Sequence, residues 1–301
     1  MTEVWSLHIL TVRDSVGVDH LDEIHVIGGN CLKGSITVQG AKNTVLPIMA
    51  ASLLQREICV LRGCPRILDV CYMEEILHIL GVVTWWKGHD LYVNGSKVFV
   101  MEIASEYPAR MRCSVILLGA LLGRNQRGVI GYPGGCVIGK RPIDFHLDVL
   151  RAMGAEILDD GGMLIAKAET LCGTTFRFPY PSVGATENAL MAAALASGTT
   201  KLLNCAREPE IVELCSFLRS MGAKISGERT GTITVDGVEK LFPTDHVTAG
   251  DRICAGTYLA AAAASGGEIE ISGVEPVVLV EQVKVVGKRG AGRGVCGGAG
   301  V

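Results

Sequence analysis

The sequence predicts an α/β protein built from repeated βαβαββ units, with helices in the middle and sheets outside. A helical pattern rich in small apolar residues occurs four times, beginning at Gly40, Arg110, Gly184 and Ala249. In three of these cases a second helical pattern follows, ends at a glycine and leads into two strand-like segments. The first helix of each unit is apolar on all sides, which is typical of a helix buried in a core.

The elements follow in the same order in each unit. In the first unit, a strand within residues 34–40 leads to the small-residue helix. The second helix then begins near Asp69 and ends at Gly81. The second helices of the next two units end at Gly154 and Gly222. Glycine at these positions suits the left-handed conformation that terminates many helices.

The repeat sets the expected domain boundaries. Residues 42–247 form one complete three-repeat domain that carries a candidate catalytic loop. Residues 25–41 and 248–276 are fragments of another domain, in which a fourth unit starts and is cut short. Residues 1–24 match nothing in the repeat and are expected to be a leader. Residues 277–301 lose the helical periodicity and are expected to be a divergent tail.

Composition excludes several classes of function. A net charge of −3 over 301 residues gives no reason to expect nucleic acid or an anionic membrane as partner. The apolar runs are shorter than the roughly 20 residues that a membrane span needs, so a soluble protein is expected. The 11 cysteines are scattered, follow no signal peptide and have no zinc-site spacing. A reducing, cytoplasmic setting without a bound metal is therefore expected. A GxGxxG pattern at residues 292–297 lacks the flanking strand and helix of a dinucleotide site.

One segment, GYPGGCVIGKRPIDFH over residues 131–146, has the composition of a reactive loop. Cys136 follows two glycines and precedes Lys140 and Arg141. Nearby positive charge favours the thiolate form, which makes a cysteine a nucleophile or proton carrier. The alternative is a buried cysteine in a tight turn. Pro142 is expected to start the helix that follows.

Cations and capping residues mark the starts of other helices. Lys42 and Arg112 lie where the helix dipole disfavours a cation, so an anionic ligand explains them better than solvent does. Together with Arg141 they are expected to converge on one phosphate-rich ligand. Ser182 and Asp251 suit helix capping, which competes with a ligand-binding or catalytic role for each.

Five segments in this order carry a resemblance to a known family. They read LKGSITVQGAKNTVLPIMAASLL, PGGCVIGKRPIDFHL, SVGATENALMAAALASGTT, NCAREPEIVELCSFLRSMGAKISG and DRICAGTYLAAAAASGG. The chain resembles the enolpyruvyl transferases over residues 22–276, in particular the UDP-N-acetylglucosamine 1-carboxyvinyltransferases that open peptidoglycan synthesis. The related shikimate-pathway branch lacks the PGGC and GAKN signatures.

The resemblance implies a fold, a reaction and a set of site residues. The fold is an inside-out α/β barrel of two three-unit domains with the active site between them. The reaction transfers the enolpyruvyl group of phosphoenolpyruvate to the 3′-hydroxyl of UDP-N-acetylglucosamine, releases phosphate and needs no cofactor. The implied catalytic residues are Cys136, Lys42 and Asp251, and the implied phosphoenolpyruvate-binding residues are Lys42, Asn43 and Arg141. The implied UDP-sugar-binding residues are Asn43, Arg112, Arg141, Pro142, Ile143, Asp144, Phe145, Tyr180, Pro181, Ser182 and Val183.

The sequence also departs from the family pattern. The fifth and sixth units are absent, and with them an aspartate and two arginines that the family uses. The loss of pattern at Val277 resembles a frameshift or a truncated gene, and impaired turnover is expected. Two other functions stay open: a module that holds the UDP-sugar without turnover, and a generic cysteine enzyme such as a hydrolase, which no His or Asn signature supports.

Overall fold

The computed structural model describes residues 6–13, 19–27, 30–104, 106–134 and 142–287. The chain divides into two compact units. The large unit is residues 39–249, and the small unit combines residues 1–38 with residues 250–301. Among the described residues, no helix is both long and apolar enough to cross a membrane.

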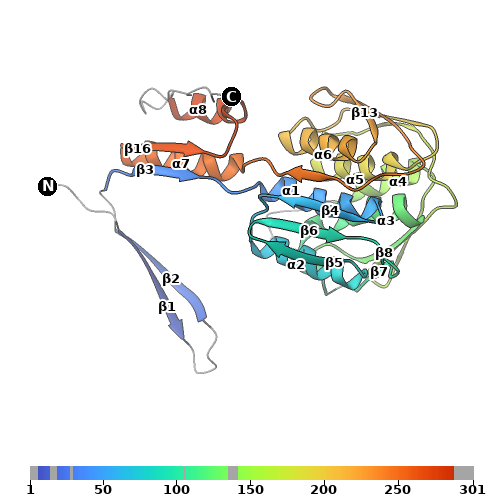
Figure 1. Ribbon diagram of the computed structural model, residues 1–301, viewed down its shortest axis with the longest axis horizontal. Helices are drawn as coiled ribbons and strands as arrows, with labels where there is room; N and C mark the ends of the chain where they lie inside the picture. Colours follow the sequence, from blue (N-terminus) through green and yellow to red (C-terminus); the bar gives the residue numbers. More distant parts are fainter. Residues whose placement is uncertain (1–5, 14–18, 28–29, 105, 135–141, 288–301) are drawn as a thin grey trace. The chain divides into compact units, whose positions relative to one another are not determined.

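The large unit contains three repeats of the same order of elements (Figure 1). The first repeat comprises α1 (Lys42–Ala51), β4 (Ile58–Arg62), α2 (Leu68–Ile79), β5 (Val83–Lys87) and β6 (Asp90–Asn94). The second comprises β7 (Glu102–Ile103), the 3₁₀ turn η3 (Arg112–Ile116), α3 (Leu117–Asn125), β8 (Arg127–Gly131), α4 (Asp144–Ala152), β9 (Glu156–Asp160) and β10 (Met163–Lys167). The third comprises β11 (Thr175–Arg177), α5 (Val183–Ala194), β12 (Thr199–Leu203), α6 (Pro209–Ser220), β13 (Lys224–Ser226) and β14 (Thr232–Asp236).

The described part of the large unit contains three four-stranded sheets, one for each repeat, and the three sheets share one topology. Their strand orders are β15-β4-β6-β5, β7-β8-β10-β9 and β11-β12-β14-β13. The first pair of each sheet is parallel and the other two pairs are antiparallel. In the first sheet, the outer strand β15 (Asp245–Val247) comes from the far end of the unit. The ring of three repeats is therefore closed by a strand distant in sequence.

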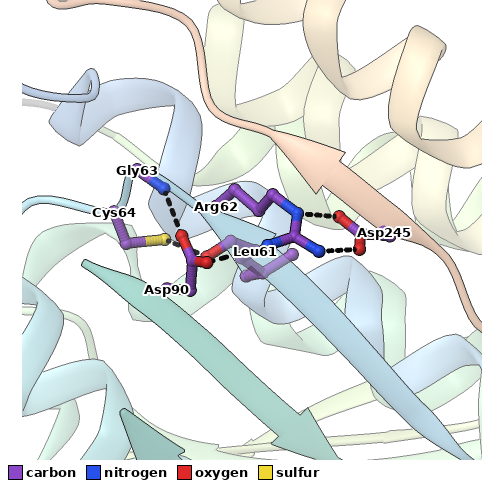
Figure 2. A network of polar contacts seen from close by, with 6 residues as sticks. All are labelled: Leu61, Arg62, Gly63, Cys64, Asp90 and Asp245. Atoms are coloured by element: carbon purple, nitrogen blue, oxygen red, sulfur yellow. Dashed lines mark hydrogen bonds and ion pairs between the residues drawn. The ribbon is translucent and has the colours of Figure 1, made fainter. Parts of the chain in front are cut away.

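An ion-pair network fastens this closing strand (Figure 2). The Arg62 guanidinium on β4 donates to both carboxylate oxygens of Asp245, with Nε–Oδ1 2.6 Å and Nη2–Oδ2 2.5 Å. Its Nη1 also donates to Asp90 Oδ2 at 2.9 Å, and Asp90 Oδ1 accepts from the Gly63 amide at 3.1 Å. Arg62 thus joins the end of β15 to the strands of the first repeat.

The helices of the core confirm the predicted architecture of central helices and outer sheets. All residues from Thr44 to Ala51 of α1 are buried, as are Leu117–Gly123 of α3 and Ala185–Ala194 of α5. Helices α2, α4 and α6 bury only one face. The helix-ending glycines have φ angles of 94°, 97° and 103° at Gly81, Gly154 and Gly222, which confirms the expected left-handed termination.

The small unit contains the beginning of a further repeat. Strand β3 (Lys33–Thr37) pairs in parallel with β16 (Glu268–Ser272), and α7 (Arg252–Ser265) precedes β16 in the chain. Strands β1 (Ser6–Arg13) and β2 (Asp19–Ile27) form an antiparallel pair. The four-residue 3₁₀ turn η4 (Pro276–Leu279) and α8 (Val280–Gly287) follow β16.

Two expectations about where helices lie are wrong. The sequence predicts a loss of helical structure at Val277, whereas η4 and α8 are helical and contact α7. Leu279 is buried there beside Ala255. The helical segment is too short to produce a periodic apolar pattern in the sequence. Pro142 does not start α4, which begins at Asp144 after Ile143.

Candidate functional site

The candidate site lies at the N-terminal ends of several helices of the large unit. Lys42 is the first residue of α1, Asp144 of α4 and Val183 of α5, while Arg112 begins η3. The η3 turn contacts α1 and α5, and α5 contacts α4. The first N–H groups of a helix lack partners within it and carry partial positive charge, so this end of the unit suits an anionic ligand.

Lys42 has a carboxylate partner inside the protein. Its Nζ lies 2.9 Å from Oδ2 of Asp69, in the first turn of α2. Both side chains keep access to solvent, with exposed fractions of 44% and 35%. The Asp69 carboxylate therefore offsets the ammonium at this unfavourable helix position, and the ammonium still faces solvent.

A partly buried thiol lies close to this pair. Burial, with smaller contributions from the neighbouring Glu187 and Asp69, raises the pKa of Cys113 to about 12, and the Lys42 ammonium opposes this shift. Cys113 follows Arg112 in η3, so the charges on α1, α2 and α5 act together on η3. The high pKa keeps this thiol protonated, which makes it a poor nucleophile.

Glu187 in the first turns of α5 is a buried carboxyl group. Burial, together with the smaller effect of the negative charges of Glu210 and Glu208 at the start of α6, raises its pKa to about 8. The carboxyl group is therefore mostly protonated near neutral pH. A neutral carboxyl group beside two other acidic side chains can donate a hydrogen bond or exchange a proton.

His146 on α4 is buried beside Arg112. Burial, and to a smaller degree the Arg112 guanidinium, lower the pKa of His146 to about 4, so the ring is neutral near pH 7. Its Nδ1 lies 3.2 Å from Nδ2 of Asn188 on α5. Among His146, Asn188 and Arg112, the positive charge is therefore carried by Arg112.

The other predicted residues fall into three groups. Asn43, Pro142, Asp144, Tyr180 and Pro181 are exposed at these helix starts, whereas Ile143 is buried in the core and Phe145 and Val183 are partly buried. Ser182 caps α5, because its Oγ accepts from the Ala185 amide at 3.4 Å. Cys136 and Arg141 lie outside the described residues.

Asp251 belongs to the small unit, where it caps α7. Its Oδ1 accepts from the amides of Ile253 at 2.8 Å and Cys254 at 3.1 Å. These bonds account for its position at a helix start. The structure therefore brings Lys42, Arg112, Asp144 and Ser182 to one end of the large unit, and Asp251 is not part of that unit.

The sequence patterns do not identify four polar residues of this region, Asp69, His146, Glu187 and Asn188. The pair Glu187–Asn188 interrupts an alanine-rich helix, and this was the available signal, since a fully buried helix rarely carries a carboxyl and an amide without a reason. Nothing local marked Asp69 or His146, whose partners are distant in sequence.

A separate pocket of about 410 Å³ lies at the opposite end of the central helices. It is lined by Leu54, which follows α1, by Gly123 and Arg124 of α3, and by Leu195 after α5. No predicted site residue lines it. Among the described residues, no group of three or more His, Cys, Asp or Glu side chains is placed to hold a metal ion.

A known family model matches most of the chain. Residues 26–292 match the model of the EPSP synthase (3-phosphoshikimate 1-carboxyvinyltransferase) family. The UDP-N-acetylglucosamine 1-carboxyvinyltransferase 2 of Caldanaerobacter subterraneus subsp. tengcongensis is 44% identical over 83% of this chain and 60% of its own length. That of Xanthobacter autotrophicus is 44% identical over 90% of this chain and 66% of its own length. The chain thus spans less than two thirds of the length of these curated relatives.

Solved structures show the same fold. The enolpyruvyl transferase NikO from Streptomyces tendae superimposes with a TM-score of 0.69 at 25% identity, over 78% of this chain and 56% of that one. An EPSP synthase from Acinetobacter baumannii gives a TM-score of 0.65 at 21% identity, over 82% of this chain and 56% of that one. The repeat topology of the large unit is therefore that of an enolpyruvyl transferase domain.

Proposed function

Because the chain belongs to the EPSP synthase family of carboxyvinyltransferases, we propose that it acts in transferring the enolpyruvyl group of phosphoenolpyruvate to the 3′-hydroxyl of UDP-N-acetylglucosamine, with release of phosphate. The observation that carries this choice of substrates is the 44% identity to relatives that bear this activity in their names. The proposed setting is peptidoglycan synthesis in the cytoplasm.

The reaction has two steps. The 3′-oxygen forms a bond to C2 of phosphoenolpyruvate, the hydroxyl proton passes to a base, and the methylene carbon C3 gains a proton. C3 then loses a proton while the bond between C2 and the phosphate oxygen breaks. This chemistry needs cations for the phosphate and carboxylate groups, a proton donor above C3 and a base near the hydroxyl.

We assign these tasks to residues of this chain. Lys42 and Arg141 hold phosphoenolpyruvate, Cys136 protonates C3, and Asp251 lies near the reacting carbon. The partial positive charge at the N-terminal end of α1 supports the first assignment, because it adds to the ammonium of Lys42 in attracting an anion. The exposed position of the Lys42 and Asp69 pair leaves that ammonium within reach of a ligand.

The UDP-sugar is proposed to bind along the starts of η3, α4 and α5. Arg112, Asp144 and Ser182 lie there. Arg112 supplies a fixed charge for a phosphate group, and N–H groups at these helix starts supply donors. The remaining proposed contacts are Asn43, Arg141, Pro142, Ile143, Phe145, Tyr180, Pro181 and Val183.

A second candidate is a module that binds the UDP-sugar without turnover. The observation that favours it is that all the proposed sugar-binding residues belong to the large unit, whereas Asp251 belongs to the small unit. Sugar binding would then need one unit, while the reaction would need groups from two.

Phosphate release from phosphoenolpyruvate in the presence of UDP-N-acetylglucosamine tests the proposal, with calorimetric titration of UDP-N-acetylglucosamine alongside. Turnover that falls about 10²–10⁴-fold in Cys136→Ala supports the transferase. Binding without turnover supports the second candidate. Absence of both turnover and binding contradicts both.

A further inference from the structure

The neighbours of the His146 ring restrict which of its two nitrogens can carry a proton. The ring is buried, and only 8% of the residue is exposed. The edge of the ring formed by Cε1 and Nε2 lies against Gly184 at the start of α5, since a Cβ atom at Gly184 would stand 2.9 Å from Cε1 and 3.2 Å from Nε2. The other ring nitrogen, Nδ1, lies 3.2 Å from Nδ2 of Asn188.

The backbone of η3 and α3 fixes the orientation of the Asn188 amide. Oδ1 accepts from the Gly119 amide at 2.5 Å, and Nδ2 donates to the Val115 carbonyl at 3.0 Å. Val115 and Gly119 are four residues apart, the spacing at which a helix bonds its own carbonyl and amide groups. A backbone N–H can only donate and a carbonyl can only accept, so the oxygen and nitrogen of this amide cannot exchange places.

We infer that Asn188 is a positioning residue that holds His146 as the neutral tautomer with its proton on Nε2. An amide NH₂ group only donates, so the Nδ1 atom that receives its bond must be unprotonated. A neutral imidazole then carries its proton on Nε2. The lowered pKa of His146 agrees with a neutral ring but does not distinguish the two tautomers.

This arrangement places one directed donor at the start of α5, beside Arg112. If the UDP-sugar binds there, an inference that rests on the proposed function, His146 offers an N–H to an acceptor oxygen without adding a second cation. Glycine at position 184 keeps this N–H accessible, because any side chain there would cover the Cε1–Nε2 edge of the ring.

The test is nitrogen NMR of the full chain, labelled with ¹⁵N in the histidine rings and recorded near pH 7. Loss of signals in His146→Gln assigns the ring. We expect wild-type Nδ1 to resonate as an unprotonated nitrogen and Nε2 as a protonated one. A cross peak between the Asn188 NH₂ protons and His146 Nδ1 is also expected. A proton on Nδ1 of the wild-type ring overturns the inference.

Asn188→Asp supplies the converse experiment. The carboxylate keeps an acceptor for the Gly119 amide but replaces the donor that faces Nδ1, so we expect the proton to move to Nδ1. Thr186→Ala is the matched control, because Thr186 is buried on the same helix and bonds Ser182 and Ala206 instead. Unchanged ring signals in a folded Asn188→Asp chain overturn the inference, and if that variant does not fold, the wild-type spectrum decides. No substrate is used, so failure here is separable from failure of the proposed function.

Discussion

At the scale of single residues, the candidate site combines balanced charges with a neutral buried acid. The Asp69 carboxylate offsets the positive charge of Lys42 at the surface. The Glu187 carboxyl group is instead mostly protonated near neutral pH and therefore uncharged. Burial disfavours the charged form of the Glu187 carboxyl group, and the neighbouring Glu210 and Glu208 disfavour it further. The protonation of Glu187 should therefore be visible in the stability of the large unit.

Glu187→Gln tests this protonation. The folded-state pKa of Glu187 is raised from 4.5 to about 8, so the stability that the protonated group supports is complete below pH 4.5 and is lost as the pH rises through 8. Glutamine has no proton to lose. In urea unfolding at pH 5, 6.5 and 8, the variant should gain stability relative to wild type by up to about 1.4 kcal/mol per pH unit. A constant difference across this range would contradict the assignment.

Cys136 is predicted to be the reactive thiol of this chain toward an epoxide phosphonate that resembles phosphoenolpyruvate. Burial raises the pKa of Cys113 and Cys215 to about 12 and that of Cys205 to about 11, so these thiols carry almost no thiolate near neutral pH. Peptide mapping after labelling should find the adduct at Cys136, most strongly with UDP-N-acetylglucosamine present. Equal labelling of Cys113, Cys205 and Cys215 would disprove this, and Cys136→Ala is the control.

Helix caps can be predicted from the sequence because their signal is local. Ser182 stands out because a hydroxyl before an apolar helix is a common cap, and the structure shows that bond. Asp69 and His146 did not stand out, because their roles depend on contacts with Lys42 and Asn188 that only the folded chain creates.

At the scale of elements, the close approach of α3 and α5 positions the buried amide. A Cβ atom at Gly119 would stand 2.2 Å from the Asn188 carbonyl oxygen and 2.4 Å from its Oδ1. Backbone atoms cannot yield as a flexible side chain can, so only glycine fits there. The small-residue pattern that predicted buried helices thus also determines how near the helices come.

Gly119→Ala should destabilise the large unit by about 1–3 kcal/mol or more, because two helices must separate. Gly123→Ala on the same helix is the matched comparison. Its Cβ would meet Leu54 Cδ2 at 3.0 Å and the Met191 carbonyl oxygen at 3.1 Å, so smaller shifts suffice. Urea unfolding should show the larger loss for Gly119→Ala, and the reverse order would argue against this packing.

The sequence predicted element types and order well but some boundaries poorly. Periodicity and glycine placement identified α2, α4 and α6, since both signals are local. The helical turns after Val277 were missed, because their few apolar contacts with α7 produce no long repeat.

At the scale of the whole molecule, the three repeats form a ring only because the last strand returns to the first sheet. Strand β15 pairs with β4, with Asp245 opposite Val60 and Val247 opposite Arg62. The Arg62 guanidinium also donates two hydrogen bonds to the Asp245 carboxylate, as Figure 2 shows. Repetition in the sequence indicated three units but not which strand would close them. That choice depends on the tertiary pairing of strands that lie 185 residues apart in the sequence, as Asp245 and Val60 do.

A chain of residues 39–249 should fold as the large unit does, whereas residues 39–243 should not fold cooperatively. The shorter chain lacks β15, which leaves β4 an open edge and removes Asp245, one of the two carboxylate partners of Arg62. Asp245→Asn in the longer chain separates the two effects, because it weakens the ion pair while keeping the strand and should lower stability only slightly. The measurement is urea unfolding followed by circular dichroism and by the fluorescence of Trp85 and Trp86, which lie on β5 of the same sheet. Equal stability of the two truncated chains would show that the ring does not depend on its closing strand.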